Sequence, residues 1–201
     1  MESFAAIVLA GGASSRMGRP KALLPFGDET LIERVVGRLR KVAGEVIVVS
    51  GRHLRLPPLL GAHVIEDETP PQGPVAGIFH GLEAARFDLG FVCGCDHPFL
   101  QTEIVKLVVD RAATSDGAVA TSGGVPQPLV AAYRKRVAAV AASMLAAGEH
   151  RASVLIERSG AVVIPEEDVR LADSSGHSFL DVDTPEAYRH ALEIFSARAS
   201  S

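Results

Sequence analysis

Residues 4–21 read FAAIVLAGGASSRMGRPK and decide the fold class of this 201-residue chain. The run from Ala5 to Leu9 contains only Ala, Ile, Val and Leu, which is typical of a strand covered on both faces. A glycine-rich loop follows at once, where open α/β sheets bind ligands, at the carboxyl end of a strand. Apolar runs of strand length then alternate with amphipathic segments of helix length. We therefore predict one α/β domain over residues 1–201 with a mostly parallel central sheet.

Hydrophobic periodicity and capping residues place the other elements. Thr30 and Glu33 are spaced as a capping box at a helix start, while Thr102 and Thr184 are predicted N-caps of later helices. A turn is predicted at 122–126. Strands are expected at residues 5–9, 45–49, 63–65, 91–95, 117–121, 129–133 and 161–164, and helices at 30–42, 75–85, 102–113, 134–147, 152–158 and from 184 onward.

Composition and charge exclude several classes of protein. With 47% hydrophobic and 22% charged residues, the chain resembles ordinary globular domains and not a disordered tail. A net charge of −4 and a pI of about 6.0 argue against a nucleic-acid-binding protein. No stretch reaches the roughly 18 apolar residues of a membrane helix. Cys93 and Cys95 are too close together to staple a long loop, so we expect a cytoplasmic protein that needs no disulfide.

The loop after the first strand has the composition of an anion-binding site. Glycines let backbone N–H groups approach a phosphate closely, and Arg16, Arg19 and Lys21 add three cations within six residues. Two common phosphate-binding fingerprints do not fit, because Gly11 and Gly12 are adjacent and Lys21 is followed by alanine. We predict a phosphate cradle here; the alternative is a glycine turn beside a solvated basic stretch.

A single carboxylate is predicted at the end of another buried strand. In residues 93–99, CGCDHPF, Asp96 ends the strand and the next His-Pro pair stops ladder pairing, so its carboxylate should reach the crevice at the sheet edge. That position suits Mg²⁺, which takes one or two protein carboxylates together with phosphates and water. Two alternatives stay open. Asp96 could be a turn or cap residue, or Cys93, Cys95 and His97 could hold zinc, although a structural zinc site needs four ligands.

Two further acidic groups lie beside predicted element ends. The run 66–68, Glu-Asp-Glu, precedes a loop whose prolines stiffen it and whose glycines let backbone approach a ligand. Asp181 and Asp183 precede the last helix, and alternation along extended chain puts both carboxylates on one side. Asp183 could therefore join Asp96 at a metal ion. The alternative is a solvated pair near the helix N-terminus.

Together these motifs resemble the molybdenum cofactor guanylyltransferase family, which belongs to the nucleotidyltransferases with a Rossmann-like α/β fold. The resemblance covers nearly the whole chain. The family's opening motifs are matched by residues 9–12 (L-A-G-G) and by residues 16–18 with Lys21 (R-M-G and a later lysine). Further matches, some with conservative changes, are residues 73–77 (G-P-L-A-G), 95–99 (C-D-x-P-F), 128–129 (P-L) and 181–186 (N-x-N-T-P-E).

The resemblance implies a Rossmann-like domain with three layers, of the nucleotide-diphospho-sugar-transferase-like fold, and the activity of a nucleotidyltransferase. The implied reaction transfers GMP from GTP to molybdenum-bound molybdopterin, which forms the guanine dinucleotide cofactor and releases pyrophosphate. Asp96 would hold Mg²⁺, the expected cofactor, with Asp183 as a second candidate ligand. The implied GTP contacts are Leu9, Ala10, Gly11, Gly12, Lys21, Asp67 and Asp96.

Arg16, Lys21 and Asp96 are the expected catalytic residues. The nucleophile would be the terminal phosphate of the pterin, whose second pKa is about 6, so no general base is required. The protein would then act by positioning and by offsetting charge on the departing pyrophosphate. Residues 1–100 would form the nucleotide- and metal-binding half. Residues 101–201 would form the acceptor-binding half, where Arg151 is the candidate contact for the pterin phosphate.

Departures from the family pattern leave other functions open. Ser50 stands where the family often has asparagine, Asp181 and Asp183 replace the usual asparagines, and the Arg-Pro-Lys run at 19–21 is shared with sister cytidylyltransferases. The alternative enzymes transfer CMP to the same cofactor or a nucleotide to a sugar phosphate, and the alternative outside catalysis is a nucleotide-binding module. Candidate partners are GTP, molybdopterin, molybdoenzyme apoproteins and other cofactor-biosynthesis proteins; neither nucleic acid nor a membrane is expected.

Overall fold

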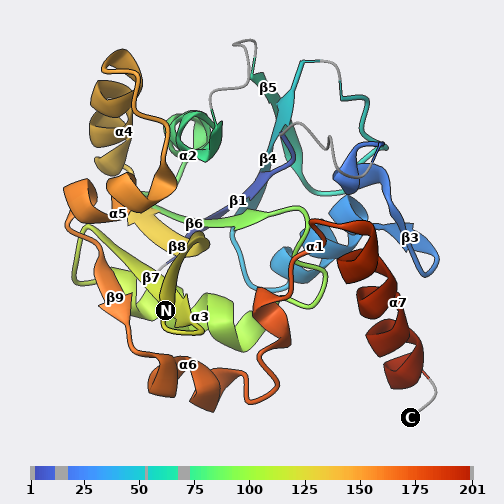
Figure 1. Cartoon of the computed structure of the whole chain (residues 1–201). Coiled ribbons are helices and arrows are strands. Elements are labelled where there is room, and N and C mark those ends of the chain that lie inside the picture. Colours follow the sequence, from blue (N-terminus) through green and yellow to red (C-terminus); the bar gives the residue numbers. More distant parts are fainter. Residues whose placement is uncertain (1–2, 12–17, 53, 68–72, 200–201) are drawn as a thin grey trace.

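The centre of the fold is a seven-stranded sheet, seen in a computed structural model that describes residues 3–11, 18–52, 54–67 and 73–199 (Figure 1). The sheet strands are β1 (Ala5–Leu9), β4 (Glu45–Gly51), β5 (His63–Asp67), β6 (Leu89–Gly94), β7 (Gly117–Ser122), β8 (Val125–Arg134) and β9 (Val162–Ile164). Their order is β5-β4-β1-β6-β8-β7-β9. Only the pairs made by β8 are antiparallel among these strands, so the predicted mostly parallel sheet is confirmed.

Helices cover both faces of this sheet and complete the three predicted layers. The helices of the described chain are α1 (Leu31–Leu39), α2 (Gly73–Ala84), α3 (Thr102–Ala112), α4 (Val137–Ala146), α5 (Ala152–Ser159), α6 (Glu166–Ala172), α7 (Pro185–Ala199) and the short 3₁₀ turns η1 (Lys21–Leu23) and η2 (His177–Phe179). Side chains alternate across β1, so Ala6 and Val8 pack with α1 and α3, whereas Ile7 and Leu9 pack with α2. Each face therefore has its own apolar core.

A third, smaller core joins the C-terminal helix to the rest of the molecule. It contains the hairpin of β2 (Pro25–Phe26) and β3 (Glu29–Thr30), the start of α1, and α7. The Phe26 ring lies 5.6 Å from that of Phe99 and 4.9 Å from that of Phe195. Because Phe99 follows the turn after β6, this core ties α7 to the end of a central strand.

Several element boundaries differ from the sequence prediction. Gln101, not Thr102, is the N-cap of α3, and its backbone N–H donates to Ser178 Oγ at 3.0 Å. The strand β8 starts at Val125 and extends beyond the end of β6, where its prolines remove no bond from a central ladder. It runs on through Arg134, so α4 starts later than predicted.

Two local capping predictions are confirmed. Glu33 N–H donates to Thr30 Oγ1, and Thr30 N–H donates to a Glu33 carboxylate oxygen at 2.8 Å. Thr184 Oγ1 accepts from Ala187 N–H at 3.1 Å. Within the described ranges, no helix is both long and apolar enough to cross a membrane.

Candidate active site

The carboxyl ends of β1 and β6 meet where the order of the strands changes direction. β1 pairs with β4 on one side and with β6 on the other, and Leu9 lies opposite Gly94. Backbone bonds extend past the strand ends: Ala10 N–H donates to Val49 O at 2.8 Å, and Cys95 N–H donates to Leu9 O at 3.1 Å. Open α/β sheets bind ligands at such switch points. The loop after β1 and the turn after β6 therefore leave the sheet side by side.

Lys21, Asp96 and Asp183 form an ionic centre at this edge. Lys21 Nζ donates to Asp96 Oδ2 at 2.6 Å and to Asp183 Oδ1. The side chains of Lys21, Asp96 and Asp183 are 22%, 14% and 46% exposed. Burial opposes the charge on Asp96, but the contacts with His97 and Lys21 outweigh it and hold the pKa of Asp96 well below its usual value. Burial also opposes the charge on Lys21, but both carboxylates together raise the pKa of this lysine.

The segment before α7 reaches the ionic centre through the backbone. Val182 N–H donates to Asp96 O at 3.0 Å, and the Val182 side chain is fully buried. This anchor sets Asp183 beside Lys21. It leaves Asp181 exposed nearby, where partial loss of hydration and the charge of Asp183 raise the pKa of Asp181. The structure thus brings together Asp96 and Asp183, as the sequence predicted, with Lys21 between them.

The second oxygen of the Asp96 carboxylate faces away from Lys21. Asp96 Oδ1 lies 3.2 Å from His97 Nδ1, a contact distance without ideal hydrogen-bond alignment. The His97 side chain is 9% exposed. Sequence reasoning considered His97 only as an alternative zinc ligand and missed this contact.

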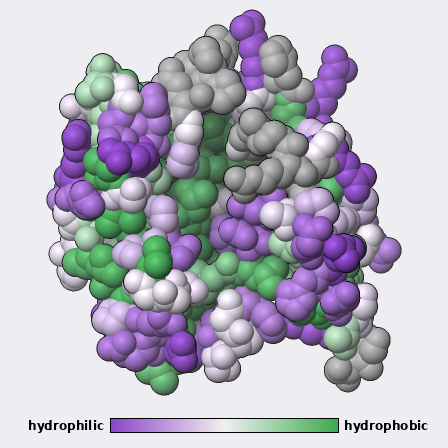
Figure 2. Space-filling view, viewed as in Figure 1, coloured by the Kyte–Doolittle hydropathy of each residue, from purple (hydrophilic) through white to green (hydrophobic). Residues whose placement is uncertain are grey.

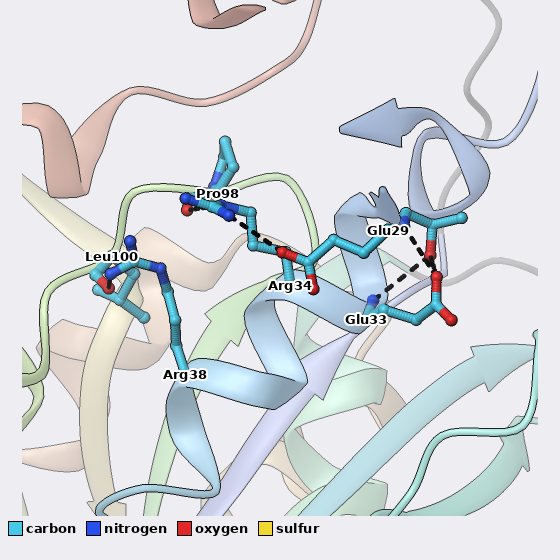
Figure 3. A network of polar contacts seen from close by, with 7 residues as sticks. Glu29, Glu33, Arg34, Arg38, Pro98 and Leu100 are labelled. Carbon is cyan, nitrogen blue, oxygen red and sulfur yellow. Dashed lines mark hydrogen bonds and ion pairs between the residues drawn. The ribbon is translucent and has the colours of Figure 1, made fainter. Parts of the chain in front are cut away.

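Two arginines of α1 hold the turn that follows Asp96 (Figure 3). Arg34 Nε donates to Pro98 O at 2.9 Å, and Arg38 Nη1 donates to Leu100 O at 3.1 Å. Arg34 also donates to Glu29 at 3.0 Å and lies over two phenylalanine rings, 5.0 and 4.8 Å from their centroids. Sequence reasoning missed both arginines. Their spacing of four residues, which places them on one face of α1, is the signal that could have found them.

Asp67 lies on the same edge of the sheet but farther along it. It ends β5 opposite Gly51, so β4 and β1 separate it from β6 and Asp96. His80 Nε2 of α2 lies 3.4 Å from Asp67 Oδ1. The structure therefore places Asp67 on the β4 side of β1 and apart from the ionic centre.

The predicted nucleotide contacts on β1 lie at its carboxyl end. Leu9 and Ala10 are buried there and Gly11 is exposed. The side chain of Leu9 packs against Gly77 of α2, where an added Cβ would lie 3.0 Å from Leu9 Cδ2. Two other predicted site residues, Gly12 and Arg16, lie outside the described residues.

Arg151 is placed beside the start of α2 and not in the ionic centre. It is exposed, precedes α5, and donates through Nε to Glu149 Oε1 at 2.9 Å. This contact lowers the pKa of Glu149 to about 2. The neighbouring His150 carbonyl lies 3.2 Å from the position of a Cβ added to Gly73.

The ionic centre has the oxygen donors of a magnesium site, with a lysine ammonium between them. Asp96 Oδ2 and Asp183 Oδ1 both face the same cationic atom. Among the residues with described positions, no three His, Cys, Asp or Glu side chains are grouped as a metal site. Mg²⁺ needs only one or two carboxylates when phosphates and water supply the rest. The residues present therefore fit this ion in company with a phosphate-bearing substrate.

The zinc alternative is not supported. Cys93 and Cys95 are free thiols buried in the core beneath α1 and α3. Burial raises the pKa of both thiols, which disfavours the thiolate that zinc requires. They act as small apolar core residues.

Sequence comparison relates the chain to one family. It matches the family model of the MobA-like NTP transferase domain over residues 6–163. A protein of Carboxydothermus hydrogenoformans named probable molybdenum cofactor guanylyltransferase is 32% identical over 202 residues, which cover 98% of this chain and all of that protein. A Mycobacterium tuberculosis protein with the same name is 38% identical over 172 residues, covering 83% of this chain and 85% of that one.

Solved structures agree with the fold described above. The molybdopterin-guanine dinucleotide biosynthesis protein A of Archaeoglobus fulgidus has a TM-score of 0.82 and 25% identity, covering 96% of this chain and 99% of that one. The 2-C-methyl-D-erythritol 4-phosphate cytidylyltransferase of Thermus thermophilus has a TM-score of 0.74 and 21% identity, covering 98% and 100% of the two chains. This second likeness shows the fold alone. The predicted nucleotide-diphospho-sugar-transferase-like fold is confirmed.

Proposed function

The chain belongs to the MobA-like NTP transferase domain family, and from this premise we propose that it transfers GMP from GTP to molybdenum-bound molybdopterin. The observation that carries the proposal is the ionic centre, a lysine and two carboxylates at the switch point of an α/β sheet. Relatives with matching names over nearly the whole chain support the choice of GTP and molybdopterin as substrates.

The proposed reaction needs charge control more than proton transfer. A terminal phosphate oxygen of the pterin attacks the α-phosphorus of GTP, a new P–O bond forms, and the α–β anhydride bond breaks to release pyrophosphate. The second pKa of a phosphate monoester is about 6, so the nucleophile is already deprotonated at neutral pH. The protein therefore has to orient two anions and neutralise the charge of the leaving group.

Lys21 is the residue best placed for this neutralisation. Its ammonium is charged throughout the neutral range because Asp96 and Asp183 raise its pKa. A triphosphate that enters the loop after β1 offers Lys21 Nζ oxygen acceptors in place of the two carboxylates. We also propose a role for Arg16 on the departing pyrophosphate, from its position in the same glycine-rich loop.

Asp96, with Asp183, would hold the divalent cation, for which we propose Mg²⁺. Bound there, Mg²⁺ would supply positive charge to the phosphate oxygens. The low pKa of Asp96 keeps this carboxylate ionised and ready to bind a cation over the whole physiological range.

The two substrates are assigned to different parts of this edge of the sheet. We propose that Leu9, Ala10, Gly11 and Gly12 lie against the guanine nucleotide, with Asp67 farther along the same edge. The pterin would bind to the half formed by residues 101–201, where Arg151 is the candidate contact for its phosphate. Asp183 belongs to the same half but would bind the metal ion. Figure 2 shows an apolar recess near the middle of this face with hydrophilic residues along part of its border, and we propose it as the surface that the flat pterin contacts.

We place the single domain in the cytoplasm, with molybdoenzyme apoproteins and other cofactor-biosynthesis proteins as further partners. Its two free, buried cysteines fit a reducing compartment.

Binding and turnover with four nucleotides test the proposal. Purified protein is given GTP, CTP, ATP or UTP, with and without Mg²⁺, and pyrophosphate release is measured with molybdenum-bound molybdopterin. We expect GTP to exceed the others by well over tenfold, because one unmatched buried polar group costs about 1–3 kcal/mol. Asp96→Asn is the control that should abolish metal-dependent release. Faster turnover with CTP than with GTP would mean that the protein transfers CMP and not GMP. Nucleotide binding without pyrophosphate release would indicate a non-catalytic nucleotide-binding module.

A further inference from the structure

The two oxygens of the Asp96 carboxylate have different surroundings. Oδ2 faces Lys21 Nζ at 2.6 Å. Oδ1 is folded back against Gly94, the last residue of β6. A Cβ added to Gly94 would lie 2.2 Å from Asp96 Oδ1 and 3.1 Å from His97 Nδ1. The first distance is one that real Cβ atoms do not reach, so a side chain at position 94 would force the Asp96 carboxylate to move. What this glycine provides is space and not an unusual backbone angle.

His97 completes the surroundings of Oδ1. Its Nδ1 is buried and lies 3.2 Å from Asp96 Oδ1, and among the described residues it makes no well-aligned hydrogen bond. A neutral imidazole carries its proton on one nitrogen and a lone pair on the other. A buried lone pair directed at a carboxylate oxygen would repel it, whereas an N–H would satisfy both groups. The proton therefore belongs on Nδ1.

Among the described residues, the other contacts on this turn are made to backbone carbonyls and do not hold the carboxylate. Val182 N–H holds the Asp96 carbonyl, and Arg34 and Arg38 hold the carbonyls of Pro98 and Leu100. Lys21 is bound to a carboxylate oxygen, but in the proposed reaction it turns to the phosphates. His97 is thus the side chain placed to keep the Asp96 carboxylate oriented once Lys21 has moved.

We infer that His97 is a positioning residue: with the space left by Gly94, it holds Asp96 Oδ1 through Nδ1–H so that Oδ2 is presented to the cation. The inference rests on the proposed function for the role of Asp96 toward a divalent ion. It requires that a guanine nucleotide binds together with the cation, but not that GMP is transferred or that the acceptor is molybdopterin.

Isosteric variants of His97 distinguish the contribution of Nδ1 from that of Nε2. In His97→Asn the side-chain amide lies near the position of Nδ1, whereas in His97→Gln it lies near the position of Nε2. Mn²⁺ binding is measured by electron paramagnetic resonance in the presence of a saturating non-hydrolysable GTP analogue. We expect His97→Gln and His97→Met to weaken Mn²⁺ binding by about 10–100-fold, the usual effect of losing a partner behind a metal ligand, and His97→Asn to recover most of the loss. Affinity for the analogue without metal should change little.

A test that needs neither metal nor activity is to determine which ring nitrogen of His97 carries the proton. In nitrogen-15 NMR spectra of the nucleotide-free protein near pH 8, His97 should be protonated at Nδ1. A proton on Nε2 alone would overturn the inference. So would Mn²⁺ affinity in His97→Gln equal to that of the natural protein.

A pair of glycine variants in one strand provides a second test. Gly94→Ala should weaken Mn²⁺ binding, because the new Cβ displaces Asp96 Oδ1. Gly90→Ala is the matched control: its Cβ would meet Ile7 Cδ1 and Leu82 Cδ2 at 2.8 Å, so it should lower stability and leave Mn²⁺ affinity unchanged. Equal effects of the two variants on Mn²⁺ affinity would contradict the inference.

If Gly94→Ala fails to fold, the His97 variants still test the inference. If GMP transfer is absent but Mn²⁺ and the tautomer behave as expected, the proposed function fails and this inference stands.

Discussion

Replacing Lys21 with methionine should destabilise the fold as well as remove activity. Methionine keeps an unbranched apolar stem but removes the ammonium that lies between Asp96 and Asp183. The loop is basic and glycine-rich, and sequence reasoning alone assigns Lys21 to ligand binding with little effect on stability. The structure changes this expectation, because the change leaves the largely buried Asp96 carboxylate without its cation.

The size of the loss follows from how buried the ion pair is. Removing one partner of a fully buried pair costs about 3–5 kcal/mol, whereas a fully exposed pair contributes about 0–1 kcal/mol. Lys21 and Asp96 are mostly buried, and Asp183 is too exposed to add much. We therefore expect a loss of about 2 kcal/mol at pH 7. For a domain of this size, that lowers the Tm by about 4–8 °C.

The loss should depend on pH with a definite sign. The pKa of Asp96 is lowered in the folded protein, so its contribution is present above the unfolded pKa of about 3.9 and is lost as the pH falls toward the folded value. The pKa of Lys21 is raised, so its contribution is present below the unfolded value and is lost only in strong alkali. The difference between the two proteins should be constant from about pH 5 to 9 and shrink by about 1 kcal/mol at pH 3.

Urea unfolding followed by far-UV circular dichroism measures this difference, since the chain has no tryptophan. The matched control is Arg189→Met, which breaks the exposed Arg189–Glu186 pair on α7 and should cost less than about 0.5 kcal/mol. A loss in Lys21→Met no larger than in this control would refute the reasoning. A loss that is the same at pH 3 and pH 7 would show that the ion pair is not its cause.

Two further substitutions test the surroundings of the site. Asp181→Asn should raise the Tm at pH 7 and leave it unchanged near pH 3: the pKa of Asp181 is raised in the fold, so its charge destabilises the protein at neutral pH and is absent below the unfolded pKa of about 3.9. An equal rise in Tm at both pH values would mean that packing, and not the charge of Asp181, causes the effect. Gly81→Ala should cost about 1–3 kcal/mol in urea unfolding, because the new Cβ would lie 2.3 Å from Ile7 Cγ2 in the core beneath α2. Gly37→Ala, on α1 with open space around the new Cβ, is its control and should not destabilise.

The sequence by itself determined the features that depend on near neighbours in the chain. The apolar run of β1 predicted a strand with the observed bounds, because continuous Ala, Ile, Val and Leu can be buried on both faces only in a central position. The caps at Thr30 and Thr184 were predicted because their partners lie three residues away. The spacing of the glycine loop and of Asp96 from their strands placed both at one edge of the sheet, since parallel strands align their carboxyl ends.

Only the tertiary structure decided what surrounds those residues. Lys21 and its partners Asp96 and Asp183 lie 75 and 162 positions apart in the chain, and no local pattern states that their atoms meet. Hydrophobic periodicity also does not predict the hydrogen bond from Arg34 to Pro98 O. Nor does it predict the space that Gly94 leaves for a carboxylate oxygen. Propensity and patterning act over a few residues, whereas these contacts depend on how elements far apart in the sequence pack against one another.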